Sequence, residues 1–119
     1  MILQNNLFNV NRLRRAKSSR LQNLVRDKIL KAFRPHLRKK DVQTPLNGVN
    51  GPDIILSRIA KKLCPYNFEV KNRNQMKGVY NWYKQATKNT KLEGVVVMKM
   101  NTRKPLAVID LDTFIALIR

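Results

Sequence analysis

Apolar residues recur at helical spacing over residues 18–33, where the chain has no Gly or Pro. A helical wheel places five apolar side chains on one face: Leu21, Leu24, Val25, Ile29 and Ala32. Gln22 lies at the flank of this face, whereas Asp27 lies nearly opposite it. We therefore predict a helix over this segment, with Ser18 or Ser19 as its N-terminal cap.

After that helix, short apolar runs alternate with turn signals. The loop TPLNGVNGP carries Asn-Gly and Gly-Pro steps, and residues 53–56 after it predict a short buried strand. Residues 67–71 alternate in polarity as a strand does, so Glu69 and Lys71 would share one face. The other predicted elements are a connection with one helical turn at 57–66, a helix over 75–88, strands over 94–100 and 106–111, and a short closing helix that Asp112 caps. This order predicts an α/β (α+β mixed) fold with a small central mixed β-sheet flanked by helices.

Length and composition fit one folded domain. The chain has 119 residues, and its hydrophobic fraction of 43% is sufficient for one core. Residues 1–17 are polar and basic, and we assign them to an N-terminal arm that precedes a domain at 18–119. No stretch approaches the ~18 uninterrupted apolar residues of a membrane span, and the start of the chain lacks a signal-peptide core. We therefore expect a cytoplasmic protein that neither enters a membrane nor is secreted, while a transit-peptide reading of residues 1–20 stays open.

The cysteine and histidine content predicts neither a disulfide nor a zinc site. The one cysteine, Cys64, has apolar neighbours, which predicts a packed small side chain rather than a nucleophile. His36 is likewise single, so no Cys/His spacing for zinc exists.

The charge indicates a polyanionic partner. Lys and Arg number 25 against 7 Asp and Glu, which gives a net charge of +18. Such residues neutralise phosphates and bind nucleic acid with salt-sensitive, sequence-independent affinity. A solvated basic face without directed contacts is the alternative, and an RNA-binding protein of ribosomal type also fits this composition. The basic candidates for nucleic-acid contact are Arg12, Arg14, Arg15, Lys17, Arg20, Arg26, Lys39 and Lys40.

Three residues are candidates for metal-dependent phosphodiester chemistry. Asp53 begins one predicted strand, while Glu69 and Lys71 lie about 6 to 7 Å apart on one face of another. Two carboxylates are hard oxygen ligands for Mg²⁺, the Val70 carbonyl would add a third oxygen, and an ammonium can orient the attacking water. An acid-x-Lys triplet is expected about once by chance in this composition, so its position at buried strands carries the argument. A buried ion pair without catalysis is the alternative.

The same residues carry a family resemblance. GPDIILS and FEVKNRN resemble the PD-(D/E)xK nuclease superfamily, with Pro52 and Asp53 as the PD element and Glu69-Val70-Lys71 as the E-x-K element. From residue 18 to 119 the chain is similar to small Holliday-junction-resolvase-like nucleases, including a compact type encoded by bacteriophages. The resemblance implies a restriction-endonuclease-like core and Mg²⁺-dependent cleavage of double-stranded or branched DNA that leaves a 5′-phosphate. It also implies Mn²⁺ as a substitute metal, no other small-molecule cofactor, a homodimer, and the host cytoplasm as location if the protein is phage-encoded.

The resemblance also implies roles for individual residues. Asp53, Glu69 and the Val70 carbonyl would hold the metal, and Lys71 would position the water. Archaeal-type resolvases carry a further Glu on the first helix; the matching position here is Gln22, which would assist catalysis or weaken metal affinity. Further DNA contacts are expected from three polar residues: Asn72, Arg73 and Gln85.

Several rivals to this reading stay open. Gln22 is also compatible with an ordinary polar residue at the edge of the core. A non-catalytic DNA-binding protein on the same fold, or a nicking or homing-type endonuclease of the same superfamily, would share these motifs.

Overall fold

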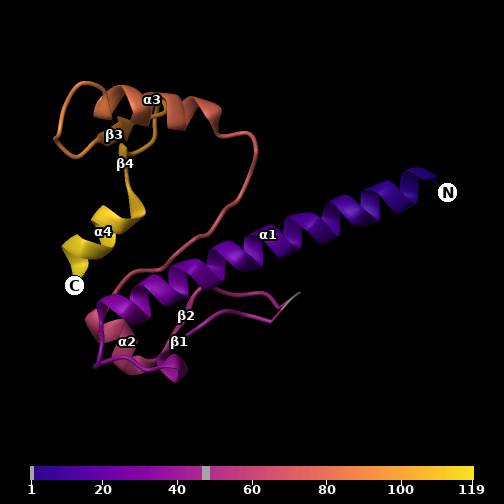
Figure 1. Cartoon of the computed structure of the whole chain (residues 1–119), viewed down its shortest axis with the longest axis horizontal. Coiled ribbons are helices and arrows are strands. Elements are labelled where there is room, and N and C mark those ends of the chain that lie inside the picture. The colour runs from indigo at the N-terminus through magenta and orange to yellow at the C-terminus, as the bar shows by residue number, and fades with distance from the viewer. Residues whose placement is uncertain (1, 47–48) are drawn as a thin grey trace. The chain divides into compact units, whose positions relative to one another are not determined.

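The computed structural model describes the backbone of residues 2–46 and 49–119, and within its first helix the side chains of 12, 13, 16, 17 and 19 onward. These residues form a mixed α+β structure with four α-helices and two small antiparallel sheets (Figure 1). The chain divides into two compact units, Met1–Asn72 and Arg73–Ile118, and the division falls inside the predicted nuclease domain. We call them the N-terminal and the C-terminal unit.

The N-terminal unit begins with one long helix, α1 (Ile2–Ala32). It is longer than predicted because residues 2–17 also lack Gly and Pro, so nothing interrupts the helix. The backbone of residues 18 and 19 therefore lies inside the helix rather than at its N-terminal end, which corrects the predicted start. The backbone of the predicted basic arm is thus helical from Ile2 onward, and its role as a DNA-binding arm stays a prediction.

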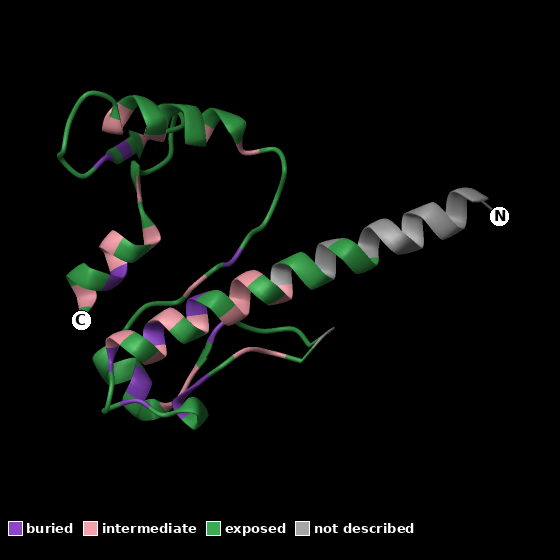
Figure 2. Ribbon diagram, in the orientation of Figure 1, coloured by how far each residue is buried: buried purple, intermediate pink, exposed green. Residues whose placement is uncertain are grey.

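The core of the N-terminal unit lies against the C-terminal half of α1 (Figure 2). Val25 and Ile29 are buried as the wheel predicts, whereas Leu24 is 48% exposed. Ile29, Val42 and Cys64 are completely buried, which confirms that Cys64 is a packed residue. Burial also raises the pKa of the Cys64 thiol, so its reactive thiolate form is disfavoured.

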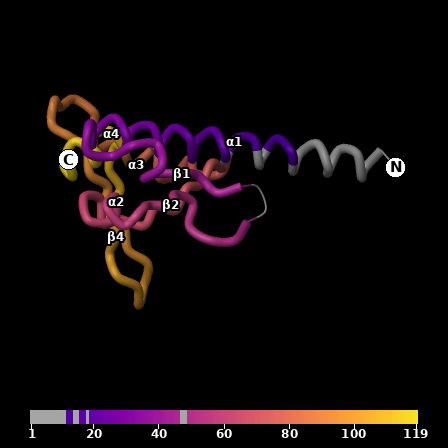
Figure 3. Tube along the Cα trace, turned by 90° about the horizontal axis from the view of Figure 1, so that it is seen from below, coloured from indigo at the N-terminus to yellow at the C-terminus, as the bar shows by residue number. Residues whose placement is uncertain are grey.

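A short antiparallel sheet lies beside α1 (Figure 3). It contains β1 (Val42–Gln43) and β2 (Ile55–Leu56), with Val42 opposite Leu56 and Gln43 opposite Ile55. A 3-10 helix (Lys39–Asp41) precedes β1, and α2 (Arg58–Leu63) follows β2. The Ser57 hydroxyl caps α2 by accepting a hydrogen bond from the Ala60 N–H at 3.2 Å.

Asp41 joins the two sides of this sheet. Its buried carboxylate accepts hydrogen bonds from the Arg38 N–H and the Ser57 hydroxyl, both at 2.8 Å, and its carbonyl accepts from the Ser57 N–H at 2.8 Å. These donors, the Arg38 amide first, hold the pKa of Asp41 below its ordinary value. The short pairing of β1 with β2 is therefore supported by further hydrogen bonds to Asp41.

Residues 67–71 form no strand, which corrects one of the predicted elements. A strand needs a partner for its backbone groups, but the Val70 N–H donates to the Asp53 carboxylate instead. The predicted alternation survives in the burial pattern, because Val70 is buried while Glu69 and Lys71 are exposed. Two separate two-stranded antiparallel sheets therefore take the place of the predicted single mixed sheet.

The C-terminal unit follows the prediction more closely. It contains α3 (Lys77–Thr87), β3 (Val95–Met98), β4 (Leu106–Ile109) and α4 (Leu111–Ile118). The strands are antiparallel, and Val95 lies opposite Ile109. Asp110 caps α4 by accepting from the Thr113 N–H at 3.1 Å, so the cap is Asp110 rather than the predicted Asp112.

No helix in the described part of the chain is both long and apolar enough to cross a membrane.

Candidate functional site

The Asp53 carboxylate connects three segments of the N-terminal unit. Its Oδ1 accepts a hydrogen bond from Nε2 of Gln22 on α1 at 3.3 Å, and its Oδ2 accepts from the Val70 N–H at 2.7 Å. The structure thus brings together three of the predicted site residues, and Gln22 occupies the inward flank that the wheel predicts. The roles of these residues in catalysis stay predictions.

Local sequence explains why Asp53 is held in this place. Gly51 has a φ of +139°, a conformation that favours glycine, and it turns the chain just before Pro52 and Asp53. Ile54 is 3% exposed and Val70 is 9% exposed, so core packing anchors the residue after Asp53 and the amide that binds it. The half-buried carboxylate is therefore positioned by its neighbours rather than by its own packing.

Glu69 and Lys71 form an ion pair on the surface. Glu69 Oε1 lies 3.0 Å from Lys71 Nζ, and the two side chains are 71% and 57% exposed. The shared face predicted for them is confirmed, whereas the buried ion pair considered as an alternative is not formed. Exposed pairs contribute little to stability, so both groups can exchange partners at low cost.

A cavity of about 720 Å³ opens next to this pair. Its lining includes Pro52, Glu69 and Lys61, so the PD turn and the E-x-K segment both border this cavity. Lys61, on α2, is a cation at this cavity that motif reading did not select. The helical spacing of α2 after the Ser57 cap is the signal that would have indicated it.

The predicted metal ligands, the carboxylates of Asp53 and Glu69 and the backbone carbonyl of Val70, are oxygen donors of the kinds that Mg²⁺ prefers. The structure brings Asp53 to Val70 by a hydrogen bond, whereas Glu69 is paired with Lys71 at the surface. Among the described residues, no three His, Cys, Asp or Glu side chains gather into a metal-binding group. A metal held here would therefore take its remaining ligands from carbonyl oxygens and water.

The predicted DNA contacts differ in how the structure places them. Arg12, Lys17, Arg20, Lys39 and Lys40 are exposed, Asn72 is exposed beside Lys71, and Arg26 is half-buried. The side chains of Arg14 and Arg15 lie outside the described residues. Arg73 and Gln85 belong to the C-terminal unit, so their predicted approach to the Asp53 site stays a prediction.

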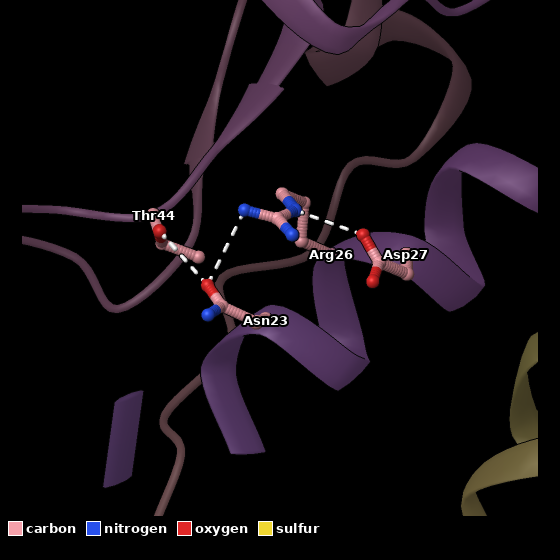
Figure 4. Close-up of polar contacts among 4 residues, drawn as sticks. All are labelled: Asn23, Arg26, Asp27 and Thr44. Carbon is pink, nitrogen blue, oxygen red and sulfur yellow. Dashed lines mark hydrogen bonds and ion pairs between the residues drawn. The ribbon is translucent and has the colours of Figure 1, made fainter. Parts of the chain in front are cut away.

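A second polar cluster lies one residue along α1 from Gln22 (Figure 4). Oδ1 of Asn23 accepts hydrogen bonds from the Thr44 hydroxyl at 3.2 Å and from Nη1 of Arg26 at 3.3 Å. Nε of Arg26 donates to Oδ1 of Asp27 at 2.9 Å. Asn23 thus binds Thr44 and Gln22 binds Asp53, so α1 holds both ends of the connection between these two residues. Two adjacent amides at the flank of an apolar helix face were the available signal for this arrangement.

Comparisons with protein-family models, with curated proteins and with solved structures found no match to this chain. A functional assignment therefore depends on the residues and their geometry.

Proposed function

We propose that the chain is a Mg²⁺-dependent DNA endonuclease of the PD-(D/E)xK type, structure-selective and similar to Holliday-junction resolvases. The observation that carries the proposal is the hydrogen bond from the Val70 N–H to the Asp53 carboxylate at 2.7 Å. This bond holds the PD turn against the E-x-K segment, as a shared metal site would require. The proposal includes a restriction-endonuclease-like core, a homodimer and action in the cytoplasm.

In this proposal each site residue has a separate task. Asp53 and Glu69 would hold the metal, which when bound neutralises the scissile phosphate and makes water a better nucleophile. The Lys71 ammonium would orient the attacking water and offset the charge that develops on the phosphate. Because the Glu69–Lys71 pair is exposed, its separation on substrate binding would cost little. Lys61 would contact a phosphate in the neighbouring cavity.

The experiment that tests the proposal is incubation of the protein with a four-way junction, a flap and a linear duplex in Mg²⁺ or Mn²⁺. We expect preferential cutting of branched DNA and a loss of at least about 100-fold in rate for Asp53→Asn and Glu69→Gln. Glu93→Gln is the matched control, because this exposed residue accepts a hydrogen bond from Thr113 in the C-terminal unit, which an amide can also accept. No cutting by the wild type, or unchanged cutting by Asp53→Asn, would overturn the catalytic claim.

A non-catalytic DNA-binding protein on the same fold is the second candidate. It is favoured by Gln22, a neutral residue that donates a hydrogen bond to Asp53 at the position where the resemblance would place a metal-binding carboxylate. Gln22→Glu separates the two candidates by replacing this donor with a carboxylate. An increase in Mg²⁺ affinity with retained cutting supports the endonuclease. If wild type and variant bind branched DNA equally and neither cuts, the binding protein is the better description.

The comparison of substrates also addresses the remaining rivals. Equal cutting of linear duplex and junction would favour a nicking or homing-type enzyme of the same superfamily. Tighter binding to structured RNA than to any of the DNA substrates would favour the RNA-binding alternative.

A further inference from the structure

A second cavity in the N-terminal unit combines an apolar floor with a cationic rim. It has a volume of about 780 Å³ and lies between α1 and the loop after β1, so we call it the α1–loop cavity. Leu30, Leu46 and Ile55 provide apolar surface, and Arg26 and Lys39 provide two cations. Its volume lies within the range of about 300 to 1,000 Å³ that is typical of small-ligand sites.

Arg26 is held in a defined orientation at this cavity. Nη1 donates to Oδ1 of Asn23 at 3.3 Å and Nε donates to Oδ1 of Asp27 at 2.9 Å (Figure 4). A guanidinium has more N–H donors than these two bonds use, and within the described part of the chain no further partner for Arg26 is found. A pre-positioned guanidinium with spare donors suits phosphate, which it binds in a planar, bidentate manner.

The charge balance at the cavity favours an anion. Two cations line it against one carboxylate, Asp27, and that carboxylate already accepts a hydrogen bond from Arg26. Lys39 is exposed at the rim and has no ion-pair partner among the described residues. A simple phosphate would satisfy the cations but would leave the apolar floor exposed to water.

A nucleotide satisfies both halves of this surface, because it joins a phosphate to a ring with apolar faces. A base can enter a cavity only when it is unpaired, since the bases of a duplex stay stacked in its interior. We propose that the α1–loop cavity holds an unpaired nucleotide of the DNA substrate, with its phosphate at Arg26 and Lys39 and its base over Leu30, Leu46 and Ile55.

This inference rests on the DNA-binding part of the proposed function and adds the form of DNA that is recognised. A flap carries unpaired nucleotides in its single strand, and a four-way junction supplies one when a base pair at its branch point opens, whereas the bases of a linear duplex stay stacked. Ile55 lines both the α1–loop cavity and the cavity beside Glu69, so one DNA strand can contact both. Asn23 supports Arg26 one residue from Gln22, which binds Asp53.

The test is fluorescence anisotropy in EDTA and moderate salt, with a labelled oligothymidine strand and a duplex of the same length as probes. We expect tighter binding of the single strand and a loss of about 10-fold in its affinity for Arg26→Gln, with the salt dependence reduced by about one contact. Lys31→Gln is the matched control, because Lys31 is an exposed cation on the same helix that does not line the cavity. It should change affinity by less than about twofold.

Two further sets of variants test where the base binds and ensure that a loss of binding is not caused by a loss of fold. Leu46 lines the cavity and is 81% exposed, so Leu46→Gln removes apolar wall without removing core; Leu92→Gln at 79% exposure is its control. We expect Leu46→Gln, but not Leu92→Gln, to weaken single-strand binding. An abasic strand should bind the wild type more weakly than the intact strand does, and it should bind the wild type and Leu46→Gln equally. Arg26→Lys, which keeps the charge but loses the planar fork, should lie between wild type and Arg26→Gln.

Each contrary result has a distinct meaning. Equal losses for Arg26→Gln and Lys31→Gln, or preference for the duplex, would overturn the inference. Equal binding of abasic and intact strands would leave a phosphate contact only, which also overturns it. If the strands bind as expected but no DNA is cut in Mg²⁺, this inference stands and the endonuclease proposal fails. If the wild type cuts DNA but Arg26→Gln binds the single strand as well as Lys31→Gln does, the endonuclease proposal stands and this inference fails.

Discussion

The two units of this chain are stabilised in different ways. The N-terminal unit has a sheet of only two residues per strand, and the carboxylates of Asp41 and Asp53 and the amide of Asn23 connect its segments through side chains. The C-terminal unit has four-residue strands in a regular antiparallel ladder. Polar residues in the first unit therefore carry structure as well as candidate chemistry. In the second unit the regular backbone ladder is the main connection, and the hydrogen bond from Thr113 to Glu93 supplements it.

The largest effect is expected in the buried core of the N-terminal unit. Ile29 is completely buried on α1, so Ile29→Ala should lower the free energy of unfolding by about 2 to 5 kcal/mol through lost burial and a cavity. Chemical denaturation followed by circular dichroism measures this. Leu24→Ala on the same helix, at 48% exposure, should cost less than about 1 kcal/mol. Equal losses of unfolding free energy for the two variants would show that α1 does not bury the face that carries Ile29.

Backbone packing is the sensitive feature of the C-terminal unit. A Cβ added at Gly94 would meet Cγ2 of Thr87 at 2.6 Å, so Gly94→Ala should destabilise by about 1 to 3 kcal/mol. Gly78 lies in α3 with nothing within 4 Å of such an atom, so Gly78→Ala should stabilise by about 0.5 to 1 kcal/mol. Thermal denaturation of both variants compares them, and the same sign for the two would contradict the close approach of α3 to β3.

A pH-dependent effect on stability is expected at Asp41, whose carboxylate supports the fold. Hydrogen bonds from Arg38 and Ser57 hold the pKa of Asp41 below its ordinary value of 3.8. The stabilisation is therefore complete above that value and is lost as the pH falls toward and through the lower pKa of the folded state. The melting temperature of the wild type should drop by a few degrees more than that of Asp41→Asn over this acidic range. Parallel curves for the two proteins would remove Asp41 from the acid response.

The sequence predicted local elements better than it predicted pairing. Helical spacing of Val25 and Ile29 predicted the buried half of α1, and the apolar runs before and after the turn at 99–105 predicted β3 and β4. The strand at 67–71 was wrong, because alternation cannot reveal that the Val70 N–H would bind a side chain 17 positions away. In the candidate site, Gln22 and Asp53 were selected by position and motif, whereas Asn23 and Thr44 were missed because their contact spans 21 positions. Long-range polar contacts between ordinary residue types leave little periodic signal.

Small stability effects are expected at the two candidate carboxylates, and they sharpen the contrast between structure and chemistry within one site. Asp53→Asn keeps one oxygen that can accept from the Val70 N–H, and Gln22 can turn its amide so that its oxygen accepts from the new NH₂ group. The free energy of unfolding should therefore fall by only about 0.5 to 1.5 kcal/mol. Glu69→Gln loses only an exposed ion pair and should cost less than about 0.5 kcal/mol. If the proposed function holds, cleavage should nevertheless fall severely in both variants, because each would remove one of the proposed metal ligands. Unfolding curves measured beside cleavage rates check this. If Glu69→Gln destabilises the fold as much as Asp53→Asn and leaves cutting intact, Glu69 is a structural residue and not a metal ligand.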